Sequence, residues 1–118
     1  MPINVHSSHW LLLVADRAER SVGIIDSLKR DRLEYLNHWK VYMKIRANKV
    51  GELGGEWTVK NYDGSLQTDS SSCGVFTLMN AESILKGIPL NNVRQENIVY
   101  YRNYVGWRLE LFSLPYNL

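Results

Sequence analysis

The fold of this chain is built around HWLLLVAD (residues 9–16) and SVGIID (residues 21–26), which the polar tetrapeptide RAER separates. Two short, partly β-branched apolar runs around a polar turn are typical of a β-hairpin. Both runs are apolar on both faces, so we expect strands inside a sheet that is covered on each side. A turn centred between Arg17 and Ala18 would pair residues whose numbers sum to 35, which sets His9 opposite Asp26.

Helical and extended patterns follow this hairpin. Residues 31–46 carry large apolar side chains at helical spacing, which predicts an amphipathic helix: Leu33, Leu36, Trp39 and Met43. Residues 56–62 predict a third strand, and residues 73–86 predict a helix that Gly87 and Pro89 end. An aromatic-rich helix is expected from residue 92 to about residue 111. Helices around a small, mostly antiparallel sheet make an α+β fold.

The bulk composition excludes several classes of protein. The chain has 118 residues, 45% hydrophobic and 22% charged, which suits one domain over residues 1–118. The net charge of +2 is scattered, so we expect no nucleic-acid partner. The apolar runs are too short to span a bilayer, and residues 1–15 do not read as a signal peptide. The single cysteine permits no internal disulfide and indicates a reducing, intracellular compartment.

That single cysteine lies in QTDSSSCGVF (residues 67–76), between a polar tract and the predicted helix of residues 73–86. At a helix start the amide groups and the helix dipole favour a thiolate, which is the nucleophilic form of cysteine. Gly74 has no side chain to obstruct a substrate backbone that approaches Cys73. An isolated Cys-Gly pair is also compatible with an inert, buried cysteine.

A thiolate nucleophile needs a general base, and histidine suits that role. His9 is the candidate, because the hairpin supplies Asp26 to orient its ring; a strand-end salt bridge is the alternative interpretation. Gln67 lies six residues before Cys73 and can donate its side-chain amide to an oxyanion, together with the Cys73 backbone amide. A solvated loop glutamine is the alternative for Gln67. Asp69 and the serines at 70–72 are interpreted as turn and capping residues.

Together these segments resemble one protein family. His9-Trp10, Gly23-Ile-Ile-Asp26-Ser27 and Gln67 followed by Cys73-Gly74-Val-Phe are similar in order and spacing to the ubiquitin-like-protein-specific, SUMO (sentrin) deconjugating cysteine proteases. The resemblance implies a papain-like fold, with His9 as base, Asp26 as its orienter, Cys73 as nucleophile and Gln67 as oxyanion donor. It also implies that Trp10 lines the channel for a glycine-glycine tail. We therefore expect a cofactor-free, metal-free protease acting on a ubiquitin-like modifier or its conjugates, in nucleus or cytoplasm.

The sequence departs from that family in two respects. Ser72 stands where the family often has an aspartate, and family catalytic domains extend much further before the catalytic histidine. We therefore expect the C-terminal catalytic part of such a domain, in a truncated or fragmentary member that lacks the N-terminal portion. The alternatives are a pseudo-protease that binds a modifier or partner, a viral or mobile-element type of maturation protease, and an acyltransferase.

Overall fold

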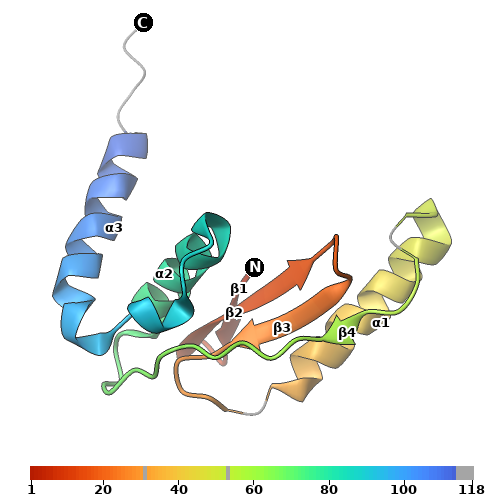
Figure 1. Cartoon of the computed structure of the whole chain (residues 1–118), viewed down its shortest axis with the longest axis horizontal. Helices are drawn as coiled ribbons and strands as arrows, with labels where there is room; N and C mark the ends of the chain where they lie inside the picture. Colours follow the sequence, from red (N-terminus) through yellow and green to blue (C-terminus); the bar gives the residue numbers. More distant parts are fainter. Residues whose placement is uncertain (31, 53, 114–118) are drawn as a thin grey trace, which may run out of the picture.

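The computed structural model describes residues 1–30, 32–52 and 54–113. The strands are β1 (Pro2–Val5), β2 (His9–Asp16), β3 (Ser21–Ile25) and β4 (Thr58–Val59). The helices are α1 (Leu33–Val50), α2 (Cys73–Lys86) and α3 (Ile98–Ser113), and the 3-10 turns η1 (Leu90–Asn92) and η2 (Gln95–Asn97) precede α3. Figure 1 shows α1 on one side of the sheet region and the α2–α3 pair on the other.

The four strands form one mixed sheet in the order β1-β2-β3-β4. β1 pairs antiparallel with β2, and β2 antiparallel with β3, whereas the two-residue β4 joins the edge of β3 in parallel. The expected α+β fold with a mostly antiparallel small sheet is therefore confirmed. The hairpin strands β2 and β3 occupy the two interior positions, as their apolar sequences predict.

The register of the β2–β3 hairpin differs from the sequence prediction. Asp16 pairs with Ser21, so the numbers of paired residues sum to 37 instead of 35. His9 is therefore not directly opposite Asp26, and that part of the prediction is wrong. A shift of two residues leaves every side chain on its predicted face, because side chains alternate with a period of two.

The turn between β2 and β3 explains the register. The Asp16 carboxylate accepts hydrogen bonds from the amides of Ala18 at 2.9 Å and Glu19 at 3.0 Å. Arg20 closes the turn in the left-handed region, at φ 55°. The turn therefore spans all four residues 17–20, and its centre lies one residue later than the sequence suggests.

A second turn, between β1 and β2, fixes where His9 begins its strand. His6 and Ser7 both have positive φ, at 50° and 56°, and the Ser8 amide donates to the Val5 carbonyl at 3.1 Å. Positive φ at both central residues is the requirement of a type I′ hairpin turn, which asparagine and glycine usually satisfy. The strand β1 was not predicted, because this turn contains neither residue.

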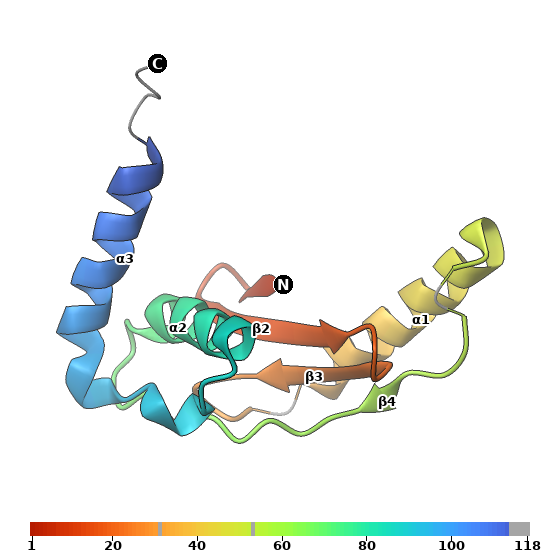
Figure 2. The same ribbon diagram turned by 45° about the horizontal axis from the view of Figure 1, so that its top comes forward.

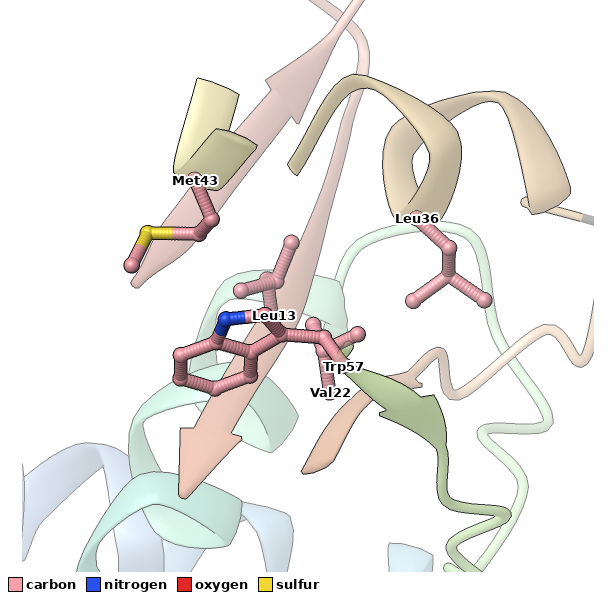
Figure 3. Close-up of a cluster of buried hydrophobic side chains, with 5 residues drawn as sticks. All are labelled: Leu13, Val22, Leu36, Met43 and Trp57. Atoms are coloured by element: carbon pink, nitrogen blue, oxygen red, sulfur yellow. The ribbon is translucent and has the colours of Figure 1, made fainter. Parts of the chain in front are cut away.

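One hydrophobic cluster forms where α1 and the chain before β4 meet the sheet. Figure 3 shows its buried members, which come from β2, β3, α1 and the residue before β4: Leu13, Val22, Leu36, Met43 and Trp57. Trp39 packs against this cluster, edge-on to Trp57 at 5.8 Å between ring centroids. Of the four predicted apolar positions of α1, only Leu33 is exposed. We call this group the sheet cluster.

A second hydrophobic cluster joins α2 to α3. Phe76 of α2, Val93 of the connecting segment and Tyr101 of α3 are buried together. Figures 1 and 2 show α3 rising beside α2 on the side of the molecule away from α1. We call this group the helix cluster.

The bounds of α2 agree with the prediction and those of α3 do not. α2 runs from Cys73 to Lys86, and Gly87 ends it with φ 67°. The predicted helix from residue 92 begins only at Ile98, because the Tyr101 hydroxyl donates to the Asn92 carbonyl at 3.0 Å and holds the preceding segment in short turns. Asp31, the predicted first residue of α1, lies outside the described residues.

The strand predicted over residues 56–62 is confined to β4, and the residues after β4 pack closely against Gly23 of β3. A Cβ atom on Gly23 would lie 2.3 Å from the Lys60 carbonyl oxygen and 2.6 Å from the Tyr62 ring. Only glycine permits this approach of β3 to the segment after β4. None of the helices in the described ranges is long and apolar enough to cross a bilayer.

Candidate active site

A buried polar contact at the start of β2 joins His9 to Asp26. His9 Nε2 lies 2.7 Å from Asp26 Oδ1, and the two side chains are only 7% and 3% exposed. Continuing the observed register would set Leu11 opposite Asp26, so His9 reaches the carboxylate diagonally, from two residues along its own strand. With Nε2 donating to Asp26, the His9 Nδ1 atom carries the lone pair that can accept a proton.

The Asp26 carboxylate is held by three donors. Oδ1 accepts from the Leu28 amide at 2.9 Å as well as from His9, and Oδ2 accepts from Arg32 Nε at 3.1 Å. Burial by itself would raise the pKa of Asp26, but the hydrogen bonds from Leu28, His9 and Arg32 together hold that pKa below its ordinary value of 3.8. Asp26 is therefore an anion at neutral pH.

Gln67 is tethered to the residue that follows Asp26. The Ser27 hydroxyl donates to the side-chain oxygen Oε1 of Gln67, and the backbone N–H of Gln67 donates to the Ser27 carbonyl at 3.0 Å. One of the two N–H groups at Gln67 Nε2 donates a hydrogen bond to the Asp69 carbonyl at 2.8 Å, and Gln67 is buried. The orientation of the Gln67 side-chain amide is thus fixed, and its second N–H group remains available to donate another hydrogen bond.

The loop before α2 is organised around Asp69. Its Oδ1 atom accepts from the amides of Ser71 at 3.2 Å and Ser72 at 3.0 Å. The hydrogen bond from the Ser72 hydroxyl is the largest cause that holds the pKa of Asp69 below its ordinary value. Arg102 of α3 donates to the Ser71 carbonyl at 2.9 Å. These contacts fix the turn that delivers Cys73 to the first position of α2, while Ser72 itself makes no side-chain bond to the helix end.

Cys73 lines a groove together with Trp10. Cys73 is 8% exposed, and it lines a groove of about 510 Å³ together with Trp10, Gly74, Leu78 and other residues of α2. A Cβ atom at Gly74 would lie 3.7 Å from the Trp10 ring, which is ordinary contact, so the packing with Trp10 does not itself require glycine. Trp10 is 41% exposed along this groove.

The predicted site residues therefore form two groups that adjoin. His9, Asp26 and Gln67 are connected through Ser27, whereas Trp10, Cys73 and Gly74 share the groove. The start of β2 lies beside α2 in both views (Figures 1 and 2). Within the described residues no hydrogen bond joins the Cys73 thiol to His9. Likewise, no cluster of three or more His, Cys, Asp or Glu side chains in those residues could hold a metal ion.

Comparison with known sequences decides the family. A sequence model described as the Ulp1 protease family, C-terminal catalytic domain, matches residues 1–111. The chain belongs to the Ulp1 protease family. Over 81 residues it is also 24% identical to Ubiquitin-like-specific protease 1 of Saccharomyces cerevisiae, a match that covers 67% of this chain and 13% of the yeast protein.

Solved structures of Ulp1-type proteases share the fold. The SUMO protease Ulp1 with its catalytic cysteine oxidised to a sulfenic acid is similar with a TM-score of 0.75 and 22% identity, over 89% of this chain and 48% of that one. The C-terminal Ulp1 protease domain in complex with Smt3, the yeast orthologue of SUMO, gives 0.72 and 22%, over 86% and 47%. The Chaetomium thermophilum Ulp1-like SUMO protease catalytic domain gives 0.68 and 24%, over 86% and 41%. The chain thus spans about half the length of these solved Ulp1 domains.

Two arginines near this Ulp1-type site were not singled out from the sequence. Arg32 binds Asp26, and Arg102 binds the loop before Cys73. Arg32 follows Asp26 by six residues in a basic stretch, and no periodicity or motif connects the two.

Proposed function

We propose that this chain carries the catalytic machinery of a thiol peptidase or isopeptidase that cleaves after the C-terminal Gly-Gly of a SUMO-like modifier. The observation that carries the proposal is the buried contact of 2.7 Å between His9 and Asp26 at the strand end beside α2, the helix that begins at Cys73. This contact leaves His9 Nδ1 as the proton acceptor. A base with a fixed ring and a thiol at a helix start are the two groups that nucleophilic catalysis by cysteine requires.

The proposed reaction proceeds through a thioester. His9 Nδ1 takes the Cys73 thiol proton, and the sulfur attacks the carbonyl carbon of the terminal glycine. As the tetrahedral intermediate collapses, the C–N bond breaks and His9 gives the proton to the departing amine. Water, deprotonated by His9, then attacks the thioester, which releases the glycine carboxylate and the Cys73 thiol.

Gln67 supports this reaction as the oxyanion donor. Ser27 and Asp69 fix its amide, and the remaining Nε2–H bond is the one that would serve the developing negative charge, together with the Cys73 amide. The nucleophile and base need not be in contact before substrate binds, since such hydrogen bonds often tighten only in the substrate complex.

The modifier class rests on the relatives and on the groove. The Ulp1 domain solved with Smt3 supports a SUMO-like partner. Trp10 and Gly74 flank Cys73 on an apolar groove, and a glycine-glycine tail is the substrate segment that needs the least width there. In this proposal Trp10 lines the channel for the tail, and Gly74 leaves room for the backbone of the tail.

A member that binds a modifier without cleaving it is the second candidate. The chain spans only 48% of the similar Ulp1 structure, and Trp10 and Leu78 beside Cys73 are 41% and 48% exposed. An apolar flank of this kind can hold a partner even where the catalytic groups are not assembled.

The test is labelling with a panel of ubiquitin-like proteins that carry an electrophile at the C-terminal glycine. We expect a covalent adduct with a SUMO-type probe, which Cys73→Ala abolishes and His9→Ala slows by about 100-fold or more. His38→Ala is the matched control, because His38 is exposed on α1, and it should label at the native rate. Binding without an adduct by the folded native chain would favour the binding member, and equal labelling of the His9→Ala variant would contradict the proposed base.

A further inference from the structure

Asp26 has a second oxygen that the His9 contact does not use, and Arg32 occupies it. Arg32 Nε donates to Asp26 Oδ2 at 3.1 Å, and its side chain is 14% exposed against 3% for Asp26. Arg32 is the residue directly before α1, whereas Asp26 is the residue directly after β3, so the contact joins the start of the helix to the end of the strand. The carboxylate is therefore held on one edge by His9 and Leu28 and on the other by Arg32.

This arrangement restricts rotation of the carboxylate about its last torsion. A carboxylate fixed at only one oxygen can turn, because the terminal torsion of aspartate is broad. A donor on each oxygen holds the plane, and a charged guanidinium donor makes a stronger bond than a neutral one. Arg32 Nη2 is buried and finds no hydrogen-bond partner in the described part of the chain, so Asp26 is the polar group there that holds the guanidinium.

The other charged groups near Asp26 are occupied or lie further out. Arg32 and Asp26 share a cleft of about 430 Å³ with Lys29, Arg30, Lys60 and Tyr62, while His9 faces Asp26 from β2. Lys29 pairs with Asp63 at 3.1 Å, and Lys60 pairs with Glu19 at 3.1 Å. Arg30 is exposed. Arg32 is therefore the cation among these that bonds directly to the carboxylate.

We propose that Arg32 is a positioning residue for the catalytic pair: it fixes the Asp26 carboxylate so that one oxygen stays on His9 Nε2 and His9 Nδ1 stays directed to the nucleophile. This inference rests on the proposed triad and adds a fourth member to it. Arg32 touches neither substrate nor thiol, and it acts only through Asp26. Its guanidinium also favours the ionised form of Asp26, which is the form that accepts from His9.

The experiment measures how fast iodoacetamide alkylates Cys73 as a function of pH, together with the ¹³C chemical shift of the Asp26 carboxyl carbon. This small reagent reports on the thiol and its base without any modifier. The variants are Arg32→Gln, Arg32→Lys and His9→Ala. The matched control is Arg30→Gln, which removes the same charge from the same loop. Circular dichroism checks that each variant is folded.

We expect Arg32→Gln to slow alkylation at neutral pH by about three- to tenfold, since one hydrogen bond to a charged group is lost. The acidic limb of the rate profile and the Asp26 carbon titration should both move to higher pH by about half to one unit. Arg32→Lys, which keeps the charge, should recover most of the acidic limb. Arg30→Gln should match the native chain in both measurements.

The outcomes separate this inference from the proposed function. If His9→Ala leaves the alkylation profile of Cys73 unchanged, the base assignment fails. If His9→Ala changes the profile but Arg32→Gln does not, only the role of Arg32 is overturned. An Arg32→Gln variant could also be less stable and yet keep the native acidic limb of the alkylation-rate profile and the native Asp26 titration. That result would show that Arg32 supports the fold and does not position Asp26.

Discussion

Asp26 is the residue at which the polar contacts of the candidate site converge. Its two oxygens accept from His9, Leu28 and Arg32, and its pKa lies below the ordinary value of 3.8. A carboxyl group whose pKa is lower in the folded than in the unfolded state adds stability above the unfolded value, and that stability is lost as the pH falls through the folded value. The contribution of Asp26 is therefore present at neutral pH and is lost progressively as the pH falls below about 4.

Replacing Asp26 by asparagine tests this contribution. At pH 7 we expect Asp26→Asn to lower the free energy of unfolding by about 2 kcal/mol, because charged hydrogen bonds are replaced by neutral ones. The difference between the two chains should shrink toward zero as the pH falls from 4 to about 2, where the native carboxyl group is also neutral. Urea unfolding at a series of pH values measures it. Asp69 and Glu82 also have lowered pKa values, but they titrate in both chains and cancel. A difference that stays constant into acid would contradict the assignment.

Two glycines are expected to respond in opposite ways to alanine. A Cβ atom at Gly23 would lie 2.3 Å from the Lys60 carbonyl oxygen, so Gly23→Ala should lower the free energy of unfolding by about 2 kcal/mol or more. Gly106 lies inside α3, and a Cβ atom added there would meet no atom within 4 Å, so Gly106→Ala should raise that free energy by about 0.5–1 kcal/mol. Urea unfolding compares both with the native chain, and equal effects at the two positions would refute this interpretation.

The sequence correctly predicted that His9 and Asp26 come together, but it did not predict the strand register through which they do so. Alternating hairpin strands suffice to put His9 and Asp26 on one face, and a register error of two residues preserves that face. The position of the turn could not be predicted, because it depends on the Asp16 side chain binding two turn amides. Arg32 could not be predicted either, since its contact with Asp26 depends on how the chain enters α1.

The turn between β1 and β2 is the local element at which substitutions are most expected to raise the stability of the fold. His6 and Ser7 hold positive φ without being glycine or asparagine, which costs conformational energy at both positions. Replacing them with the pair asparagine-glycine (His6→Asn with Ser7→Gly) should raise the free energy of unfolding by about 1 kcal/mol. Thermal and urea unfolding measure the gain.

The control for this double variant is Ser8→Gly, at the next position, where φ is not positive. It should add no stability and instead lower it slightly, through backbone entropy and through loss of the hydrogen bond of 3.3 Å from the Ser8 hydroxyl to the Val5 carbonyl. An equal gain at residue 8 would show that the turn geometry is not the cause. Because asparagine-glycine keeps the turn geometry that leads into His9, the double variant should leave Cys73 alkylation unchanged.

The elements that the sequence predicted well have local signals at their ends. α2 begins after a polar tract and ends at a glycine in the left-handed region, so both of its bounds agree with the prediction. The start of α3 depends on Tyr101 holding Asn92 from nine residues away, and β4 depends on pairing with β3. Long-range contacts of this kind leave no mark in a short window of sequence.

The molecule as a whole exposes a large apolar surface over its described residues. Large apolar side chains contribute on the outer faces of α1 and α3: Val41, Tyr42, Ile45, Val99, Tyr100, Trp107, Leu109 and Leu111. Apolar surface of this extent is usually covered by another polypeptide surface.

We therefore expect the folded 118-residue chain to bind an apolar-surface dye and to self-associate at tens of micromolar, as sedimentation velocity would measure. Val99→Lys with Leu109→Lys should reduce both effects, because these side chains are 70% and 65% exposed on α3. A native chain that stays monomeric and binds no dye would contradict this expectation.

The presence of a sheet cluster and a separate helix cluster has a consequence for the order in which activity and secondary structure are lost. His9 begins β2 and Asp26 directly follows β3, whereas Cys73 begins α2, the helix that contributes Phe76 to the helix cluster. The two chemical partners are thus carried by different elements, and a small displacement of α2 along the sheet would separate the thiol from its base while each element keeps its secondary structure. In rising urea, alkylation of Cys73 should consequently lose its dependence on His9 before the far-ultraviolet circular dichroism changes. Such a gap between inactivation and unfolding would show that the packing of α2 on the sheet loosens before the secondary structure is lost.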